Sequence, residues 1–194
     1  MDEWSGGDLR VRPIGVIHSN FTEAASTPIQ PTYAQEAAGQ VVIAEPYASA
    51  LDDLEGFERV WLIYWMDRAD GFQAHVTPYR DTRRHGLFAT RAPCRPNPIG
   101  LSAVRLVRRE GRTLHVADVD ILDGTPLLDL RPYVPAFDAH VRSRAGWLDE
   151  SAEGRRLADN RFHASLNREF GGKASSPSSP TSGGAPPVAD GEEP

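Results

Sequence analysis

The sequence predicts a mostly β protein, built as a small antiparallel β-barrel with short peripheral helices. Three observations support this prediction: the apolar segments are short, turns or polar loops separate them, and no amphipathic helix of crossover length lies between them. Successive strands are therefore expected to run antiparallel in a closed or nearly closed sheet. The expected strands are residues 12–19, 39–43, 57–66, 85–90, 101–107, 113–121 and 127–130.

The 194-residue chain is long enough for one domain with a substantial core. We expect a loose leader at residues 1–11 and the barrel at 12–148. A spacing of apolar residues compatible with a helix predicts a helical extension over 149–170. Residues 171–194 contain five Gly, five Pro and five Ser, a composition that predicts a disordered tail.

In the first half of the chain, Pro13 begins the first strand, where a missing backbone donor is tolerated. The polar loop 20–36 is long for a simple connection, and its prolines predict an extended backbone. Residues 46–53 could form one or two helical turns. Residues 57–66 are apolar on both faces from Val60 onward, which is typical of a central strand buried on both sides.

In the second half, residues 85–90 are expected to form a strand that enters a proline-rich loop, and 101–107 a strand that leaves it. Between 113 and 121, apolar residues occupy even positions at first and odd positions later. A strand with a fixed core face needs an extra residue for that change, so we predict a β-bulge near Ala117-Asp118. The turn 123–126 precedes the last strand.

The proline loop, residues Arg91–Ser102, has prolines at positions 93, 96 and 98. Proline fixes φ and removes a backbone donor, so the loop is stiff and extended. It carries two guanidinium groups, an amide and a hydroxyl, and it ends near Gly100. These features are typical of the wall of a binding site, but a rigid structural turn explains them equally well.

The chain has a net charge of −6, and its basic residues are twenty arginines and one lysine. The stretch from Arg80 to Arg95 is locally basic, with the single acid Asp81. Arginine's planar fork suits phosphates and base edges, so this patch is a candidate RNA contact. Solvated surface is the alternative, and charge runs usually mean little more.

Several classes of site are excluded. The sequence has no G-x-G-x-x-G fingerprint, no P-loop, no G-x-S-x-G elbow and no H-x-x-x-H pair. The single cysteine, Cys94, permits no intramolecular disulfide and makes a zinc site improbable, so we expect no metal. Arginines flank Cys94, yet a packing role is favoured over a nucleophilic one.

The N-terminus is acidic and lacks the apolar region of a signal peptide. The longest apolar run, residues 60–66, is too short to cross a bilayer. We expect a cytoplasmic protein without membrane contact.

Polar residues gather at the expected strand ends and in the loops. In isolation, Asp123 and Thr125 are explained as turn formers, and Asp129 and Arg131 as a surface pair. Their joint occurrence beside the proline loop favours a functional site. The set is Asp67, Arg68, Arg91, Arg95, Asn97, Ser102, Asp123, Thr125, Asp129, Arg131 and Tyr133.

Three motifs of this sequence resemble the signatures of the TsaA-like family, also called TrmO or YaeB. They are R-P-N-P-I-G-L-S at 95–102, D-G-T-P at 123–126 and L-D-L-R-P-Y at 128–133. The resemblance covers residues 12–148. It implies an S-adenosylmethionine-dependent methyltransferase on a small β-barrel, which works as a homodimer. The implied reaction is N6-methylation of threonylcarbamoyl-adenosine at position 37 of tRNA.

The resemblance also implies a set of residues that bind the cofactor. They are Pro31, Thr32, Tyr33, Asp67, Arg68, Arg91, Asn97, Leu101, Asp123, Gly124, Thr125 and Pro126. The chain departs from the family pattern in three places. This chain has Pro31-Thr32-Tyr33 where the better-known bacterial members have Pro-Gly-Leu, and Asp67-Arg68 where they have His-Gln. It has Arg131 where the family commonly has lysine. Longer bacterial members also have an additional C-terminal domain.

For catalysis, we expect a carboxylate to accept the proton that N6 loses. Asp129 or Asp67 is assigned this role, and Tyr133 completes the expected catalytic set. The residues expected to contact RNA are Arg80, Arg83, Arg84, Arg95 and Arg131. Two alternatives remain open: methylation of a small metabolite, and a non-catalytic module that binds S-adenosylmethionine or RNA.

Overall fold

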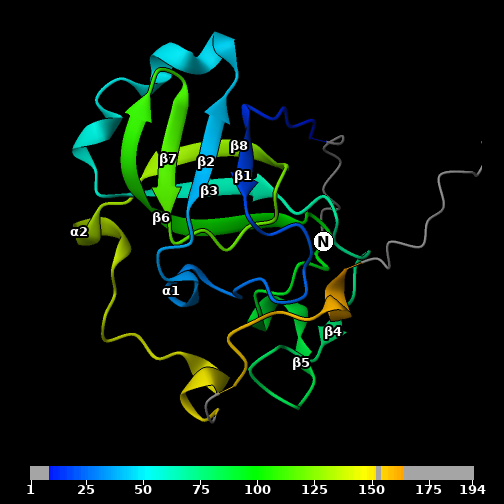
Figure 1. Cartoon of the computed structure of the whole chain (residues 1–194). Helices are drawn as coiled ribbons and strands as arrows, with labels where there is room; N and C mark the ends of the chain where they lie inside the picture. Colours follow the sequence, from blue (N-terminus) through cyan, green and yellow to red (C-terminus); the bar gives the residue numbers. More distant parts are fainter. Residues whose placement is uncertain (1–8, 152–153, 164–194) are drawn as a thin grey trace, which may run out of the picture. The chain divides into compact units, whose positions relative to one another are not determined.

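A computed structural model describes residues 9–151 and 154–163. Six strands form a closed antiparallel barrel in the order β1-β2-β7-β6-β3-β8, with β8 pairing back onto β1 (Figure 1). The predicted fold class is confirmed. The barrel strands are β1 (Gly15–Ser19), β2 (Gly39–Ile43), β3 (Arg59–Trp65), β6 (Ile99–Glu110), β7 (Thr113–Ala117) and β8 (Thr125–Pro132).

Shorter elements surround the barrel. A two-stranded sheet pairs β4 (His75–Val76) with β5 (His85–Gly86). The two α-helices, α1 (Pro31–Ala34) and α2 (Pro135–Asp138), are single turns. The 3-10 helices are η1 (Glu45–Leu51), η2 (Leu54–Gly56), η3 (Leu87–Ala89), η4 (Gly146–Asp149) and η5 (Asn160–Phe162).

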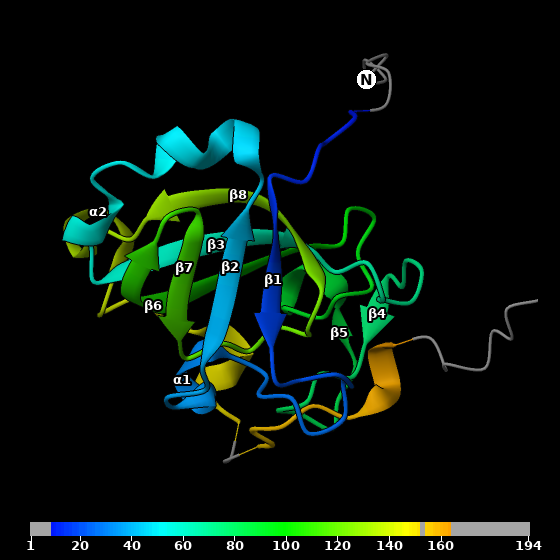
Figure 2. The ribbon, with the colours of Figure 1, turned by 45° about the horizontal axis from the view of Figure 1, so that its top comes forward.

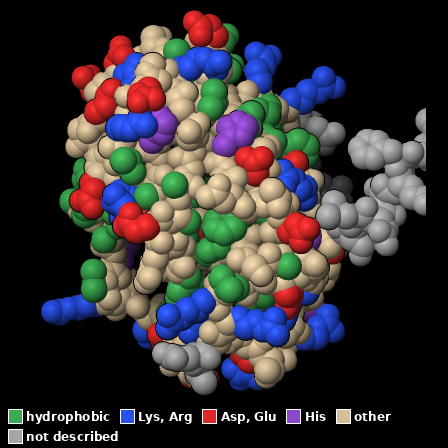
Figure 3. Space-filling model, in the orientation of Figure 1, with side chains coloured by type: hydrophobic (Ala, Val, Ile, Leu, Met, Phe, Trp, Pro, Cys, Tyr) green, Lys and Arg blue, Asp and Glu red, His purple; other side chains and the backbone are tan. Residues whose placement is uncertain are grey.

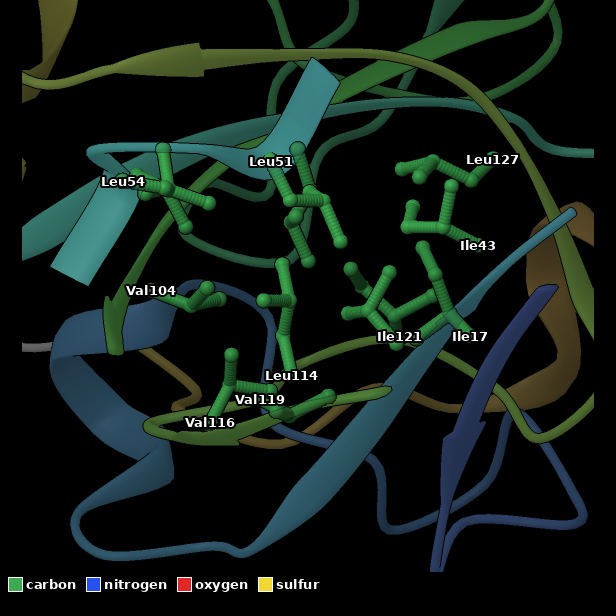
Figure 4. Packing of buried hydrophobic residues seen from close by; sticks show 13 residues of the cluster. Ile17, Ile43, Leu51, Leu54, Val104, Leu114, Val116, Val119, Ile121 and Leu127 are labelled. Atoms are coloured by element: carbon green, nitrogen blue, oxygen red, sulfur yellow. The ribbon is translucent and has the colours of Figure 1, made fainter. Parts of the chain in front are cut away.

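The barrel interior is filled by apolar side chains from every strand, which point toward one another (Figure 4). In a closed barrel alternate residues face inward, and Val60 and Leu62 of β3 are fully buried in this way. The outward residues of β3 are less covered than we expected of a strand buried on both sides, and Trp65 is 45% exposed. The turns η1 and η2 lie at one end of the barrel (Figure 2), and their residues Leu51 and Leu54 belong to the apolar cluster (Figure 4).

A second cluster of buried residues lies outside the barrel. It consists of Val76, Leu87, Ala92, Cys94 and Phe162. These residues come from β4, η3, the proline loop and η5, so they join segments that are far apart in the sequence. This second cluster supports the loops below the barrel, where Figure 1 shows β4 and β5.

Several predictions of local structure are wrong. The strand expected at 85–90 ends at Gly86, because the backbone N–H and the hydroxyl of Thr90 both donate to Leu87 O and close a 3-10 turn. The loop expected to be extended contains α1, since Pro31 occupies the first helical position, where its missing N–H costs nothing.

A third wrong prediction is the β-bulge near Ala117-Asp118. Strand β7 ends at Ala117, and Asp118 adopts a left-handed conformation with φ 65°. Its carboxylate compensates this strain by accepting hydrogen bonds from Glu36 N at 3.1 Å and Arg59 Nη2 at 3.0 Å. The register irregularity lies on the partner strand, between Leu106 and Arg108 of β6.

The described part of the expected helical extension is not helical apart from 3-10 turns. Tertiary contacts explain the extended backbone: Leu157 bridges to Pro28, His163 bridges to Ala69, and Phe162 is buried in the second cluster. Residues 164–170, the expected tail at 171–194 and residues 1–8 of the expected leader lie outside the described residues.

Candidate functional site

A pocket of about 370 Å³ lies where the proline loop meets the ends of the barrel strands. We call it the main pocket. Its walls come from the loop 24–30, the end of β3 with the residues after it, the proline loop with the start of β6, and the segment 120–125. Of the predicted site residues, it brings together Asp67, Arg68, Arg91, Arg95, Leu101, Ser102 and Thr125.

Arg68 connects two of the predicted motifs. Its guanidinium Nη2 donates a hydrogen bond to the carbonyl oxygen of Asp123. Gly124 follows with φ 76°, a backbone conformation that glycine adopts without strain, and the Arg68 guanidinium lies against this turn. The residue pair that departs from the family pattern therefore contacts the D-G-T-P turn directly.

Asp123 is an anchor of this turn. Its Oδ1 accepts a hydrogen bond from Ser19 N at 3.2 Å and lies 3.1 Å from His18 Nδ1. The hydrogen bond from the Ser19 backbone, aided by His18, lowers the pKa of Asp123. The carboxylate is thus ionised at neutral pH, and it holds β1 against the turn.

The proline loop forms one wall of the main pocket. Arg91 donates a hydrogen bond to Gln30 Oε1 across the pocket's edge. Arg95 Nη1 donates to Thr90 O at 3.2 Å, and its guanidinium carbon lies 5.5 Å from the centre of the Phe88 ring. Residues of the proline loop therefore line the main pocket, and both of its arginines are held by neighbouring groups.

Sequence reasoning missed Tyr64 and Asp120, which are hydrogen-bonded through the predicted residue Ser102 in the main pocket. Ser102 Oγ donates to Asp120 Oδ1 at 2.7 Å, and Tyr64 Oη lies 3.2 Å from Ser102 Oγ. Burial raises the pKa of Asp120 to about 6, and burial also raises the pKa of Tyr64. The available signal was a lone carboxylate between the apolar residues Val119 and Ile121.

Gly100 makes this arrangement possible. It pairs with Tyr64 across β3 and β6, and a Cβ at this position would lie 2.2 Å from the tyrosine ring. Only glycine leaves room for the ring at this distance. The glycine that the sequence suggested for close approach therefore accommodates a tyrosine of the same protein.

Several predicted residues do not line the main pocket. Asp129 Oδ2 accepts a hydrogen bond from Arg131 Nε at 3.0 Å on the surface of β8. Tyr133 packs against Trp61, with ring centres 5.5 Å apart, and Trp61 in turn lines the pocket. Asn97 is exposed.

A second pocket of about 650 Å³ adjoins the main pocket and shares Gln30, Thr90 and Arg91 with it. Thr32 and Tyr33 of α1 line this second pocket. Pro31 begins that helix but lines neither pocket, and Pro126 lies in β8 opposite Val16.

Tyr33 is held by arginines. Its hydroxyl accepts a hydrogen bond from Arg80 Nη1, and the guanidinium carbons of Arg80 and Arg156 lie 5.8 and 5.6 Å from the ring centre. Arg80 thus belongs to the wall of the second pocket as well as to the basic patch.

The basic patch is organised around Asp81. Its carboxylate accepts from Arg83 Nε at 3.2 Å and lies 2.9 Å from His85 Nε2. Hydrogen bonds from the backbone of Arg83 and from His85 lower the pKa of Asp81 well below its usual range. Arg84 donates to His75 O at 3.4 Å, and arginine side chains gather on the lower part of the face in Figure 3.

Cys94 belongs to the second cluster, where it is fully buried, and burial raises the pKa of its thiol. These properties fit packing and oppose a nucleophilic role. Within residues 9–151 and 154–163, no three His, Cys, Asp or Glu side chains are grouped so that they could hold a metal ion. In the same residues, no helix has the length and apolarity needed to cross a membrane.

Comparisons with known proteins agree with this architecture. The tRNA-methyltransferase O N-terminal domain matches residues 16–139. A probable S-adenosyl-L-methionine-binding protein from Pyrococcus abyssi is 48% identical over 161 residues, which cover 82% of this chain and 87% of that protein. A tRNA (adenine(37)-N6)-methyltransferase from mouse is 34% identical over 69% of this chain and 32% of its own length.

Among solved structures, TrmO from Pseudomonas aeruginosa superposes with a TM-score of 0.62 at 39% identity. The match covers 72% of this chain and 62% of that protein, so the chain spans less than two thirds of its length. The domain match, the identities and the shared barrel lead to one conclusion: the chain belongs to the TrmO family.

Proposed function

We propose that this protein is an S-adenosylmethionine-dependent methyltransferase that methylates N6 of threonylcarbamoyl-adenosine at position 37 of tRNA. The main pocket carries the proposal, since it joins the proline loop, Arg68 and the D-G-T-P turn into one site of small-molecule size. The relatives' names, an S-adenosyl-L-methionine-binding protein and a tRNA (adenine(37)-N6)-methyltransferase, support the same assignment.

The chemistry of the pocket suits this cofactor, which carries a carboxylate, an ammonium group and a sulfonium centre. Arg68 and Arg91 supply guanidinium groups for a carboxylate. Asp67 supplies negative charge for the cationic groups, and Leu101 offers apolar surface for the adenine ring. When bound, S-adenosylmethionine supplies an electrophilic methyl group.

The protein must align the acceptor nitrogen with that methyl group and keep water out. The proline loop suits both tasks because it is stiff before any ligand binds. A nitrogen that bears an acyl group is a weak nucleophile, so loss of its proton accompanies transfer and a nearby base is needed. Of the two carboxylates expected in this role, Asp67 lines the main pocket and Asp129 faces Arg131 outside it.

On this proposal the basic patch contacts the phosphates of tRNA through Arg80, Arg83, Arg84 and Arg95, and Arg131 on β8 makes a further contact. The side chain of Arg83 is 63% exposed and is therefore available for such a contact. Arg80 and Arg95 lie at the second and main pockets respectively, so they connect the patch with the proposed site of methylation.

We also propose that the protein is a cytoplasmic homodimer, as membership of the family suggests. Trp65, Ile99 and Leu101 are 45 to 54% exposed on the neighbouring strands β3 and β6. A second copy could cover this apolar surface. Light scattering coupled to size-exclusion chromatography would measure the mass in solution, and a monomeric mass at assay concentrations would refute the homodimer.

A methyl-transfer assay with labelled S-adenosylmethionine tests the function. The acceptors are tRNA carrying the threonylcarbamoyl group, the same tRNA without it, and a low-molecular-weight cell extract. Label in the modified tRNA alone is the expected result. Label only in the small-molecule fraction would refute the tRNA substrate, and cofactor binding without transfer to any acceptor would indicate a binding module.

A further inference from the structure

The side chains of Tyr64, Ser102 and Asp120 form a hydrogen-bonded chain that ends in the main pocket, and all three line it. They come from β3, β6 and the segment after β7. Ser102 is 2% exposed, so its hydroxyl has little access to water. A carboxylate held in this way has a defined position relative to a bound ligand.

The direction of the hydrogen bonds follows from the number of donors. An ionised carboxylate only accepts, so the single hydroxyl hydrogen of Ser102 points to Asp120. The hydroxyl of Tyr64 must then donate to Ser102 Oγ. One oxygen of the carboxylate is engaged in this chain, which leaves Asp120 Oδ2 to accept a proton.

Asp120 differs from the other two carboxylates considered for proton transfer. Asp67 lies 3.9 Å from the guanidinium of Arg68, and Asp129 is hydrogen-bonded to Arg131. Each of these two carboxylates therefore already has a cationic partner. The hydrogen-bond partner of Asp120 is a neutral hydroxyl group instead.

We propose that Asp120 is the general base of the methyl transfer. As the nitrogen lone pair forms a bond to the methyl carbon, the carbon–sulfur bond breaks, and sulfur keeps its electron pair and becomes a neutral sulfide. The N6 proton passes to the Asp120 carboxylate and leaves to water after release of the product. This inference rests on the proposed function.

The electrostatic setting supports this role. Burial raises the pKa of Asp120 to about 6, against the lowering effects of the Ser102 hydrogen bond and of Arg91. The partly buried Tyr64 faces it from β3, and the other titratable or charged groups that line the same pocket are Asp67, Arg68, Tyr79, Arg95 and His163. A base with a pKa near 6 is ionised at pH 7 and accepts a proton more readily than an ordinary aspartate.

The first test compares Asp120→Asn with Asp52→Asn, an exposed aspartate paired with Arg109 away from the pocket. For Asp120→Asn we expect kcat on modified tRNA to fall about 100-fold or more, the usual range for loss of a general base. The dissociation constant for S-adenosylmethionine, measured by calorimetry, should change less than about threefold. Asp52→Asn should match the wild type in both.

The second test does not depend on activity. Carboxyl-carbon NMR of the protein without cofactor should show Asp120 titrating near pH 6. Ser102→Ala removes a hydrogen bond that stabilises the ionised form, so it should shift this titration and the acidic limb of the kcat profile upward together. If Asp120 had only a structural role, a shift in its titration would not be accompanied by a shift in the acidic limb of the kcat profile.

Three results would overturn the inference. The first is an active Asp120→Asn enzyme with an unchanged pH profile, and the second is an Asp120 that titrates near pH 4. The third is a large loss of cofactor affinity at unchanged kcat, which would make Asp120 a ligand of the cationic cofactor. The proposed function survives all three; it fails only if the wild-type protein itself does not methylate modified tRNA, and the inference then fails with it.

Discussion

The barrel and the loop layer beside it are held together in different ways. By loop layer we mean residues 67–98 and the segment 154–163. In the barrel every strand pairs with two neighbours and the interior is apolar. In the loop layer the strands are two residues long, and the small second cluster is the apolar centre.

The loop layer depends instead on contacts between side chains and backbone. The Tyr79 hydroxyl donates to Asp159 O at 3.0 Å, and Trp147 Nε1 donates to Ala89 O at 2.8 Å. Asp81 and Asp159 each accept from backbone and arginine donors. The two regions therefore differ: the barrel supplies the larger apolar interior, and the loop layer supplies polar groups to the walls of both pockets.

The largest expected effect is on the free energy of unfolding, and it differs between the barrel interior and the second cluster. Leu62→Ala in the barrel should lower the free energy of unfolding by about 3–4 kcal/mol, because it leaves a cavity among fully buried side chains. Leu87→Ala in the second cluster should lower the free energy of unfolding by about half as much. It should weaken cofactor binding more than Leu62→Ala does. Urea unfolding and calorimetry measure both. Equal losses of stability would show that the loop layer is part of one cooperative core.

The second prediction concerns pH and connects the barrel with the site. The pKa of Asp120 is raised from 3.8 to about 6 on folding, so the folded state binds more protons than the unfolded state in this window. The contribution of Asp120 to stability is therefore greatest below pH 4 and falls as pH rises through 6. Asp120→Asn should be more stable than the wild type at pH 7, by at most about 3 kcal/mol.

Urea unfolding from pH 4 to pH 8 measures this difference. Because other carboxylates also titrate in this range, the relevant quantity is the variant minus the wild type at each pH. A difference that stays constant with pH would contradict the raised pKa. A stable but inactive variant would also show that the site is maintained at a cost in stability.

A smaller effect is expected where a barrel strand borders the pocket. Gly100→Ala places a methyl group 2.2 Å from the Tyr64 ring, so the ring must move and the hydrogen bond to Ser102 is lost. We expect a loss of about 1–3 kcal/mol in unfolding experiments. Gly56→Ala is the control, since no atom lies within 4 Å of its added Cβ. If both variants are equally stable, Tyr64 is not confined by Gly100.

The smallest effect is expected on the surface of the loop layer. Arg83→Glu should reduce the slope of log affinity for tRNA against log salt concentration by about 1, since one phosphate contact is lost. Arg112→Glu in the turn between β6 and β7 is the control on the barrel. Filter binding at several salt concentrations measures the slopes, and equal slopes for both variants and the wild type would exclude Arg83 from phosphate contact.

Sequence reasoning was most successful where local chemistry decides the structure. Strand β2 was predicted with its observed bounds, and the Asp-Gly pair of 123–124 forms the tight turn that its composition favours. The closed barrel followed from the short apolar segments and the turns between them. The strand bounds and the turn depend on interactions within a few residues of one another, whereas the pairing of β1 with β8 that closes the barrel joins distant segments.

Tertiary contacts decided the rest. The apolar spacing between residues 157 and 166 is compatible with a helix, yet bridges to Pro28 and Ala69 keep its described part extended. Asp129 and Asp120 are indistinguishable as sequence letters, and only the folding of the strands places Asp120 beside Ser102 and Asp129 beside Arg131. The sequence by itself determined the barrel and the site's main motifs, because turn chemistry and alternation are local. Which carboxylate lies buried in the pocket depends on contacts between distant segments, and only the tertiary structure decided it.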